Sequence, residues 1–149
     1  MRGGLFPDHG RAAVQPRLSG SGGGPFLSCS YPLSSPFALL DMDKAAARVK
    51  QALSRREHIA VFGDYDVDGI TATCLLTEYL RSKGGHVTSY IPARLEEGYG
   101  LNPIAIDTLK KQGVELIVTV DCGITANHEA ALCREVGIGR AGNASGSIL

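Results

Sequence analysis

The sequence lacks a net charge, because 15 Lys and Arg residues balance 15 Asp and Glu residues over 149 positions. No overall field therefore draws nucleic acid to the chain, and a nucleic-acid partner would need a local basic patch. No apolar run reaches membrane-spanning length and no signal-peptide core opens the chain, so we expect no membrane partner. The four cysteines form no CxxC pair, which indicates reduced, mostly structural thiols and a cytoplasmic location.

Both ends of the chain have little order-forming composition. Residues 1–24 contain seven glycines, and residues 139–149 are rich in Gly, Ala and Ser. Such segments bury too little apolar surface to offset the loss of chain entropy. We therefore expect a low-order head over 1–35, one ordered domain over 36–138, and an unstructured, foreign-looking tail over 139–149.

Between these ends, short apolar runs alternate with helical patterns. The runs predict strands over 58–62, 87–91 and 116–120. Helices are expected from Met42 with Asp41 as its cap, over about 68–83, from Asn102-Pro103 to Gly113, and over about 125–136. In the helix over 68–83, one side is expected to hold Ile70, Cys74, Leu75 and Tyr79. This order predicts an α/β fold, a short doubly wound parallel sheet with helices on both faces.

Acidic residues follow two of the predicted strands. Asp64, Asp66 and Asp68 come directly after the strand over 58–62, and Asp121 follows the strand over 116–120. Because ligands of parallel sheets bind beyond the carboxyl ends of the strands, these acids can converge at one edge. Carboxylates packed so closely repel one another, and a divalent cation is the usual compensation.

The acidic turn also allows three other interpretations. An EF-hand loop would need a bidentate Glu at its twelfth position, where this chain has Leu75, and a helix before it, so it is discarded. A haloacid-dehalogenase-like phosphatase would use Asp66 and Asp68 but leaves Asp64 and Asp121 without a role. A solvated acidic turn that caps the next helix is the structural alternative.

Four motifs in order give a more specific signal. The first two motifs are Leu-Asp-Met-Asp-Lys-Ala at residues 40–45 and Gly-Asp-Tyr-Asp-Val-Asp-Gly-Ile-Thr at residues 63–71. The other two are Glu-Gly-Tyr-Gly-Leu at residues 97–101 and Val-Asp-Cys-Gly-Ile at residues 120–124. Together they resemble the DHH phosphoesterase superfamily, and within it the RecJ-type single-strand exonucleases. The resemblance runs from about residue 25 to residue 138.

Carried onto this sequence, the resemblance implies a site for two Mn²⁺ or Mg²⁺ ions. Asp66 and Asp68 would be metal ligands with catalytic roles, and Asp121 would be a ligand shared by both ions. Asp64 would be a nearby acid, or a ligand in some states. Oxygen-rich ligation suits hard cations, and two such ions clamp a phosphodiester and activate a water.

The function that the resemblance implies is metal-dependent phosphodiester hydrolysis, most like a 5′-to-3′ single-stranded DNA exonuclease of recombination and repair. Single-stranded DNA is the implied partner. Arg94 is a candidate phosphate contact and Tyr99 a candidate stacking contact for a nucleotide. The alternative for Arg94, Glu96 and Glu97 is a solvated charged loop.

The sequence departs from the family pattern where an Asp-His-His motif is due after residue 138. Its four histidines are His9, His58, His86 and His128, and none is a convincing substitute. We therefore expect a truncated chain that is inactive alone. The alternatives are another DHH phosphoesterase acting on small nucleotides or pyrophosphate, and a non-catalytic remnant that only binds.

Overall fold

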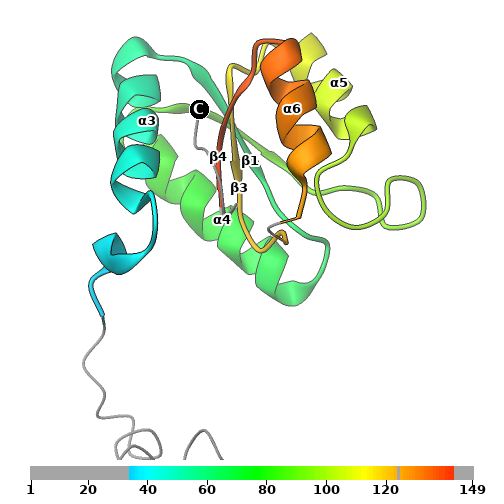
Figure 1. Ribbon diagram of the computed structural model, residues 1–149, viewed down its shortest axis with the longest axis horizontal. Helices are drawn as coiled ribbons and strands as arrows, with labels where there is room; N and C mark the ends of the chain where they lie inside the picture. The colour runs from blue at the N-terminus through cyan, green and yellow to red at the C-terminus, as the bar shows by residue number, and fades with distance from the viewer. Residues whose placement is uncertain (1–33, 124, 143–149) are drawn as a thin grey trace, which may run out of the picture. The chain divides into compact units, whose positions relative to one another are not determined.

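The computed structural model describes residues 34–123 and 125–142, and Figure 1 shows how their helices and strands are arranged. Strands and helices alternate along this part of the chain. In chain order the elements are η2 (Pro36–Ala38), α3 (Met42–Arg55), β1 (His58–Phe62), α4 (Val67–Ser82), β2 (His86–Tyr90), α5 (Pro103–Lys111), β3 (Leu116–Thr119), α6 (Asn127–Glu135) and β4 (Gly139–Ala141).

The strands form one parallel sheet in the order β2-β1-β3-β4. At the carboxyl end of β1, Phe62 lies between Tyr90 of β2 and Thr119 of β3. The chain first moves outward from β1 to β2, then crosses to β3 on the other side of β1. The carboxyl ends of β1 and β3 are therefore neighbours at the point where the winding reverses, the usual place for a ligand in such sheets. The predicted α/β fold is confirmed.

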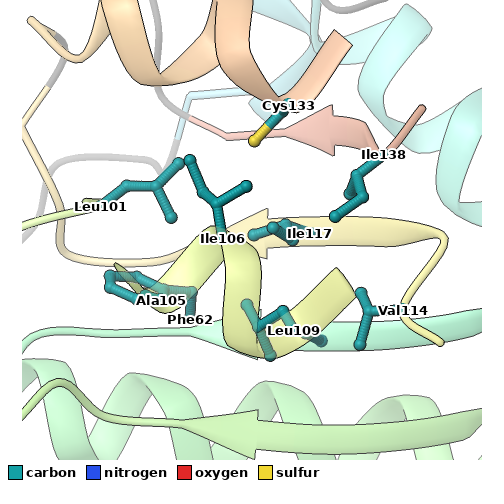
Figure 2. Packing of buried hydrophobic residues seen from close by; sticks show 10 residues of the cluster. Phe62, Leu101, Ala105, Ile106, Leu109, Val114, Ile117, Cys133 and Ile138 are labelled. Carbon is teal, nitrogen blue, oxygen red and sulfur yellow. The ribbon is translucent and has the colours of Figure 1, made fainter. Parts of the chain in front are cut away.

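Helices cover both faces of the sheet, because side chains along a strand point alternately to its two faces. Ala60 and Phe62 belong to the core under α5 and α6, whereas Ile59 and Val61 belong to the core under α3 and α4. Figure 2 shows the first core, which is completed by Leu101, Ala105, Ile106, Leu109, Val114, Ile117, Cys133 and Ile138. All four of these β1 residues are fully buried, as expected of a central parallel strand.

Helix α4 presents a different face to the sheet from the one predicted. Its buried residues are Gly69, Thr73, Thr77 and Leu80. The predicted side is largely exposed: Ile70 is 45%, Leu75 70% and Tyr79 54% accessible. Small residues on the inner face let the start of α4 approach the backbone of the acidic turn, so close packing overrides hydrophobicity here.

Helix α3 begins at Met42 as predicted, but Asp41 does not cap it. Asp41 has a left-handed backbone (φ 59°) and its side chain makes no capping hydrogen bond. Its carboxylate instead pairs with Lys44 at 2.7 Å. A side-chain cap needs an extended backbone at the capping position, which Asp41 does not have.

The end of the described chain differs from the predicted unstructured tail. Residues Gly139–Ala141 form β4, which pairs in parallel with β3. Ala141 is 2% exposed and joins the core under α3 and α4. Small residues can form an additional strand where the neighbouring strand already provides an apolar surface. Composition alone did not reveal this contribution of residues 139–141. Residues 143–149 of the predicted tail, and residues 1–33 of the head predicted over 1–35, lie outside the described residues.

The cysteines that the structure describes carry free thiols. Cys133 is buried and Cys122 half-buried, whereas Cys74 is exposed. Cys29 lies outside the described residues. None of the helices within the described ranges combines the length and apolar character needed to cross a bilayer.

Candidate functional site

Two glycines shape the acidic turn between β1 and α4. A Cβ on Gly69 would collide with the backbone oxygen of Asp64, and a Cβ on Gly63 would collide with Oγ1 of Thr73. The first helical turn of α4 can therefore pack against the acidic turn only because positions 63 and 69 lack side chains. The glycines serve close packing, and this packing fixes the backbone that carries the three acids.

Asp66 and Asp68 lie on either side of the start of α4. Asp66 is the N-cap, and its Oδ1 accepts a hydrogen bond from the backbone N–H of Gly69 at 2.9 Å. Asp68 lies in the first helical turn, where a negative charge is favoured by the helix dipole. Both side chains are exposed. Asp66 therefore caps α4 with one carboxylate oxygen, while its second carboxylate oxygen stays available to a ligand.

Asp64 is held in a different environment. Only 4% of the residue is exposed, and its Oδ1 is buried without a hydrogen-bond partner among the described residues. A buried charged oxygen without a partner is costly, and it is usually compensated by a cation or by a proton. The sequence does not reveal the burial of Asp64, because the turn reads as uniformly polar.

Asp121 follows β3 at the neighbouring strand end. The backbone N–H of Val120 donates to the carbonyl oxygen of Phe62 at 2.9 Å, which ties the two strand ends together. Asp121 itself has a left-handed backbone (φ 51°). Partial desolvation, then the negative charges of Asp66, Asp68 and Asp64, raise the pKa of Asp121. The three acids that follow β1 therefore act electrostatically on Asp121.

This donor set fits a hard divalent cation in charge and in chemistry. It offers four carboxylates that repel one another and one buried oxygen that lacks a hydrogen-bond partner in the described part of the chain. Within the described ranges, however, no group of three or more His, Cys, Asp or Glu side chains is arranged to hold a metal ion. Ligation by Asp64, Asp66, Asp68 and Asp121 thus remains a prediction.

The two candidate substrate residues lie on the loop between β2 and α5. The guanidinium carbon of Arg94 is 5.1 Å from the ring centroid of Tyr65, which stands between Asp64 and Asp66. A guanidinium stacked on a ring keeps its N–H edges free for a phosphate. Tyr99 is 60% exposed, and its ring edge lies 4.0 Å from the position that a Cβ on Gly123 would occupy.

A cavity of about 300 Å³ opens beside the end of β3. Its polar lining includes Tyr99, Thr119, Thr125, Glu129 and Arg140, and residues 122 and 123 connect it to Asp121. Arg140 donates to the carbonyl oxygen of Ala126 at 3.5 Å, while its Nε is buried without a partner among the described residues. Sequence analysis missed Arg140 because it lies in the stretch expected to be unstructured.

Cys122 lies next to Asp121 but is not a reactive thiol. Burial, then the negative charges of Asp64 and Asp121, raises the pKa of the Cys122 thiol to about 11. The thiol therefore stays protonated, in agreement with the prediction of reduced, mostly structural thiols.

The described histidines do not join the acids. His58 and His86 begin β1 and β2, at the opposite edge of the sheet, and their rings stack on each other at 3.9 Å. His128 is on α6 with its side chain 83% exposed, as predicted. His9 lies outside the described residues.

Glu97 is a further residue of the site whose role the sequence did not reveal. Its carboxylate accepts hydrogen bonds from the Tyr90 hydroxyl at 2.8 Å and from the Ala93 backbone N–H at 2.9 Å. The alternative of a solvated charged loop is therefore wrong for Glu97. A glutamate that precedes a Gly-x-Gly turn was the available signal, but its partners are set by the tertiary fold.

Comparison with known proteins defines the class that this fold and site represent. Residues 58–140 match the family described as "DHH family, N-terminal domain". The match spans all four strands up to the middle of β4, including both acidic strand ends. The chain belongs to the DHH family.

Individual relatives narrow the similarity to one kind of protein. The chain is 46% identical over 103 residues to the single-stranded-DNA-specific exonuclease RecJ of Bacillus subtilis, and 40% identical over 111 residues to that of Thermus thermophilus. It also resembles a crystal structure of exonuclease RecJ bound to manganese, with 37% identity and a TM-score of 0.67 over 78% of this chain.

The chain is much shorter than these relatives. The matches cover 69% and 71% of this chain but only 13% and 16% of the two curated relatives, and 30% of the solved structure. The similarity therefore concerns the part that carries the acidic strand ends.

Proposed function

We propose that the chain provides carboxylate ligands for a Mn²⁺- or Mg²⁺-dependent phosphodiesterase that degrades single-stranded DNA in the 5′-to-3′ direction. The observation that carries this proposal is the parallel pairing of β1 and β3, because Asp64, Asp66 and Asp68 follow one strand and Asp121 follows the other at adjacent carboxyl ends. The similarity to RecJ exonucleases, one of them bound to manganese, supports the same substrate and the same metals.

Each acid has its own part in this proposal. Asp66 and Asp68 present exposed side chains at the start of α4, Asp121 follows the neighbouring strand β3, and Asp64 adds a buried carboxylate oxygen. Asp66, Asp68 and Asp121 would hold a pair of divalent ions, which would supply the positive charge that activates a water and stabilises the leaving oxygen of a phosphodiester.

Arg94 and Tyr99 are proposed to hold the nucleic acid. Arg94 lies over Tyr65 in the acidic turn, so a phosphate on its free edge would lie beside the carboxylate cluster. The exposed ring of Tyr99 offers a stacking surface for a base at the rim of the cavity. The guanidinium of Arg94 would thereby supply the local positive charge that a nucleic-acid partner requires in a chain of zero net charge.

Calorimetric titration of the 149-residue chain with Mn²⁺ tests the metal ligands. Asp68→Asn and Asp121→Asn should each weaken binding about tenfold or more, because each removes one charge from the cluster. The control is Asp107→Asn, which removes an exposed acid that pairs with Lys111 on α5. Equal Mn²⁺ affinity in all four proteins would contradict the proposal.

We further propose that the chain alone has no appreciable nuclease activity. The imidazoles within the described residues lie away from the acids, so the ligand set there consists of carboxylates only. Incubation of 5′-labelled single-stranded DNA with the purified chain and Mn²⁺ should leave the DNA intact. Degradation that disappears in Asp68→Asn would overturn this part of the proposal.

The alternative substrates are small nucleotides and pyrophosphate. The stacking surface of Tyr99 and the cation at Arg94 favour a nucleic-acid strand over pyrophosphate, which has no base. The family match favours DHH chemistry over a haloacid-dehalogenase-like phosphatase.

A further inference from the structure

The loop between β2 and α5 depends on one carboxylate. Glu97 accepts hydrogen bonds from Tyr90 at the end of β2, from the backbone N–H of Ala93 at the start of the loop, and from Asn102 at 3.5 Å at its end. Asn102 also caps α5, because its Oδ1 accepts from the N–H of Ala105 at 2.8 Å. One side chain therefore joins both ends of the loop to the sheet and to the next helix.

The loop reaches the site through an aromatic contact. Tyr90, the hydroxyl partner of Glu97, stacks on Phe62 with ring centroids 5.5 Å apart. Phe62 is fully buried and ends β1, directly before the acidic turn. The carbonyl oxygen of Tyr90 also accepts from the N–H of Gly63 at 3.1 Å. Glu97 is thus fixed relative to the backbone that carries Asp64.

The candidate substrate residues flank Glu97 in sequence. Arg94 lies three residues before it and Tyr99 two residues after it. Gly98 and Gly100 adopt left-handed backbone (φ 77° and 79°), which turns the chain sharply on either side of Tyr99. A Cβ on either glycine would meet nothing within 4 Å, so these glycines provide conformation and not space.

The charge state of Glu97 suits this role. Burial opposes ionisation, but hydrogen bonds from the Ala93 N–H, Tyr90 and Asn102 outweigh it and lower the pKa of Glu97. Burial, then the bond to Glu97, raises the pKa of Tyr90 to about 12, so the hydroxyl remains a donor. The carboxylate is an acceptor for three donors and makes no ion pair within the described residues.

We propose that Glu97 is a positioning residue of the site, which holds the loop so that Arg94 lies over Tyr65 and Tyr99 faces the end of β3. This inference rests on the proposed function for its consequence in DNA binding, but its geometric part stands independently. Glu97 touches neither metal nor substrate in this role; it acts through Arg94 and Tyr99.

The geometric part is tested by NMR spectroscopy of the 149-residue chain. The Arg94 Nε–H resonance, assigned with Arg94→Lys, should be shifted by the ring current of Tyr65, because the guanidinium carbon lies 5.1 Å from the ring centroid. Glu97→Gln should abolish this shift, because an amide cannot accept from the Tyr90 and Ala93 donors with both of its heteroatoms. The control Glu96→Gln alters an exposed neighbouring acid and should leave the shift unchanged.

An unchanged Arg94 resonance in Glu97→Gln would overturn the geometric part. If Glu97→Gln loses the native amide signals of β1 and β3, it does not fold, and Tyr90→Phe then decides the matter. It removes one donor but keeps the ring stacked on Phe62, and it should reduce the Arg94 shift.

A double-mutant cycle tests the consequence for DNA. The probe is a 5′-phosphorylated oligothymidylate in the presence of Mn²⁺. Glu97→Gln should weaken binding about tenfold when Arg94 is present but less than about twofold when Arg94 is replaced by Ala. Equal losses in both backgrounds would show that Glu97 does not act through Arg94. If the unaltered chain does not bind the probe, the proposed function fails, while the NMR result still decides the position of the loop.

Discussion

At the scale of single residues, the acidic turn combines structural and chemical roles in the same side chains. Asp66 caps α4 with one oxygen and leaves the other for a ligand. Asp68 lies in the first turn of α4, where the helix dipole favours its charge. The two roles can be separated by substitutions that remove the charge but keep the hydrogen-bond acceptor.

Asp66→Asn and Asp66→Ala should differ in stability but agree in metal binding. Asn retains an oxygen that can accept from Gly69, whereas Ala loses the cap and should lower the free energy of unfolding by about 1 kcal/mol. Both lack the charge and should bind Mn²⁺ more weakly. Urea unfolding and calorimetry measure the two effects, and equal stability of both variants would contradict the capping role.

Gly69→Ala should destabilise the fold although Ala is the better helix former. The new Cβ would collide with the backbone of Asp64, at a cost of about 2 kcal/mol or more. Gly84→Ala is the control: its φ is 81° and nothing lies within 4 Å, so only backbone strain of about 1 kcal/mol is expected. Urea midpoints compare the two, and a smaller loss at position 69 would contradict the close packing.

The residues of the site were predictable to the extent that their pattern is local. Three acids after a buried strand, and one after its neighbour, follow from strand periodicity and parallel topology. The burial of Asp64 and the hydrogen bonds of Glu97 were not predictable, because both depend on contacts between segments that are distant in sequence. Metal ligation by the acids is still to be measured.

At the scale of elements, strands were predicted better than helix faces. Strand β1 has the predicted bounds, β2 begins and ends one residue earlier than predicted, and β3 ends one residue earlier. Buried parallel strands are apolar throughout, which makes them easy to detect. The inner face of α4 was predicted wrongly, since Gly69, Thr73 and Thr77 carry no hydrophobic signal and only the packing against the turn selects them.

The amino ends of β1 and β2 should make stability depend on pH. Burial, then the positive charge of His86, lowers the pKa of His58 below its ordinary 6.5. Below pH 6.5 the unfolded chain therefore binds more protons than the folded one at this residue. Its contribution to the free energy of unfolding is complete above the ordinary pKa and decreases as the pH falls toward the folded pKa.

Urea unfolding between about pH 7.5 and about pH 5.5 measures this dependence. His86→Phe keeps an aromatic ring against His58 but removes the second charge, so it should flatten the decline. His128→Phe alters an imidazole that is exposed on α6 and should leave the decline unchanged. If the free energy of unfolding declines with equal slope in all three proteins, the decline is caused by groups other than His58 and His86.

At the scale of the whole molecule, β4 belongs to the fold despite its composition. A chain that ends after residue 138 should be about 2 kcal/mol less stable than one that ends after residue 142. The shorter chain lacks the pairing with β3 and the buried Ala141. Urea midpoints of the two lengths test this, and equal midpoints would mean that β4 contributes nothing.

The buried Oδ1 of Asp64, which has no hydrogen-bond partner among the described residues, has a consequence for selection experiments. Without a cation, a neutral residue at position 64 should fold more favourably than the acid, so selection for thermal robustness alone would drive the carboxylate out of a randomised library. Selection for metal binding would retain the carboxylate at position 64. The frequency of aspartate at position 64 after each selection would therefore show whether this position is optimised for the metal-bound or for the metal-free protein.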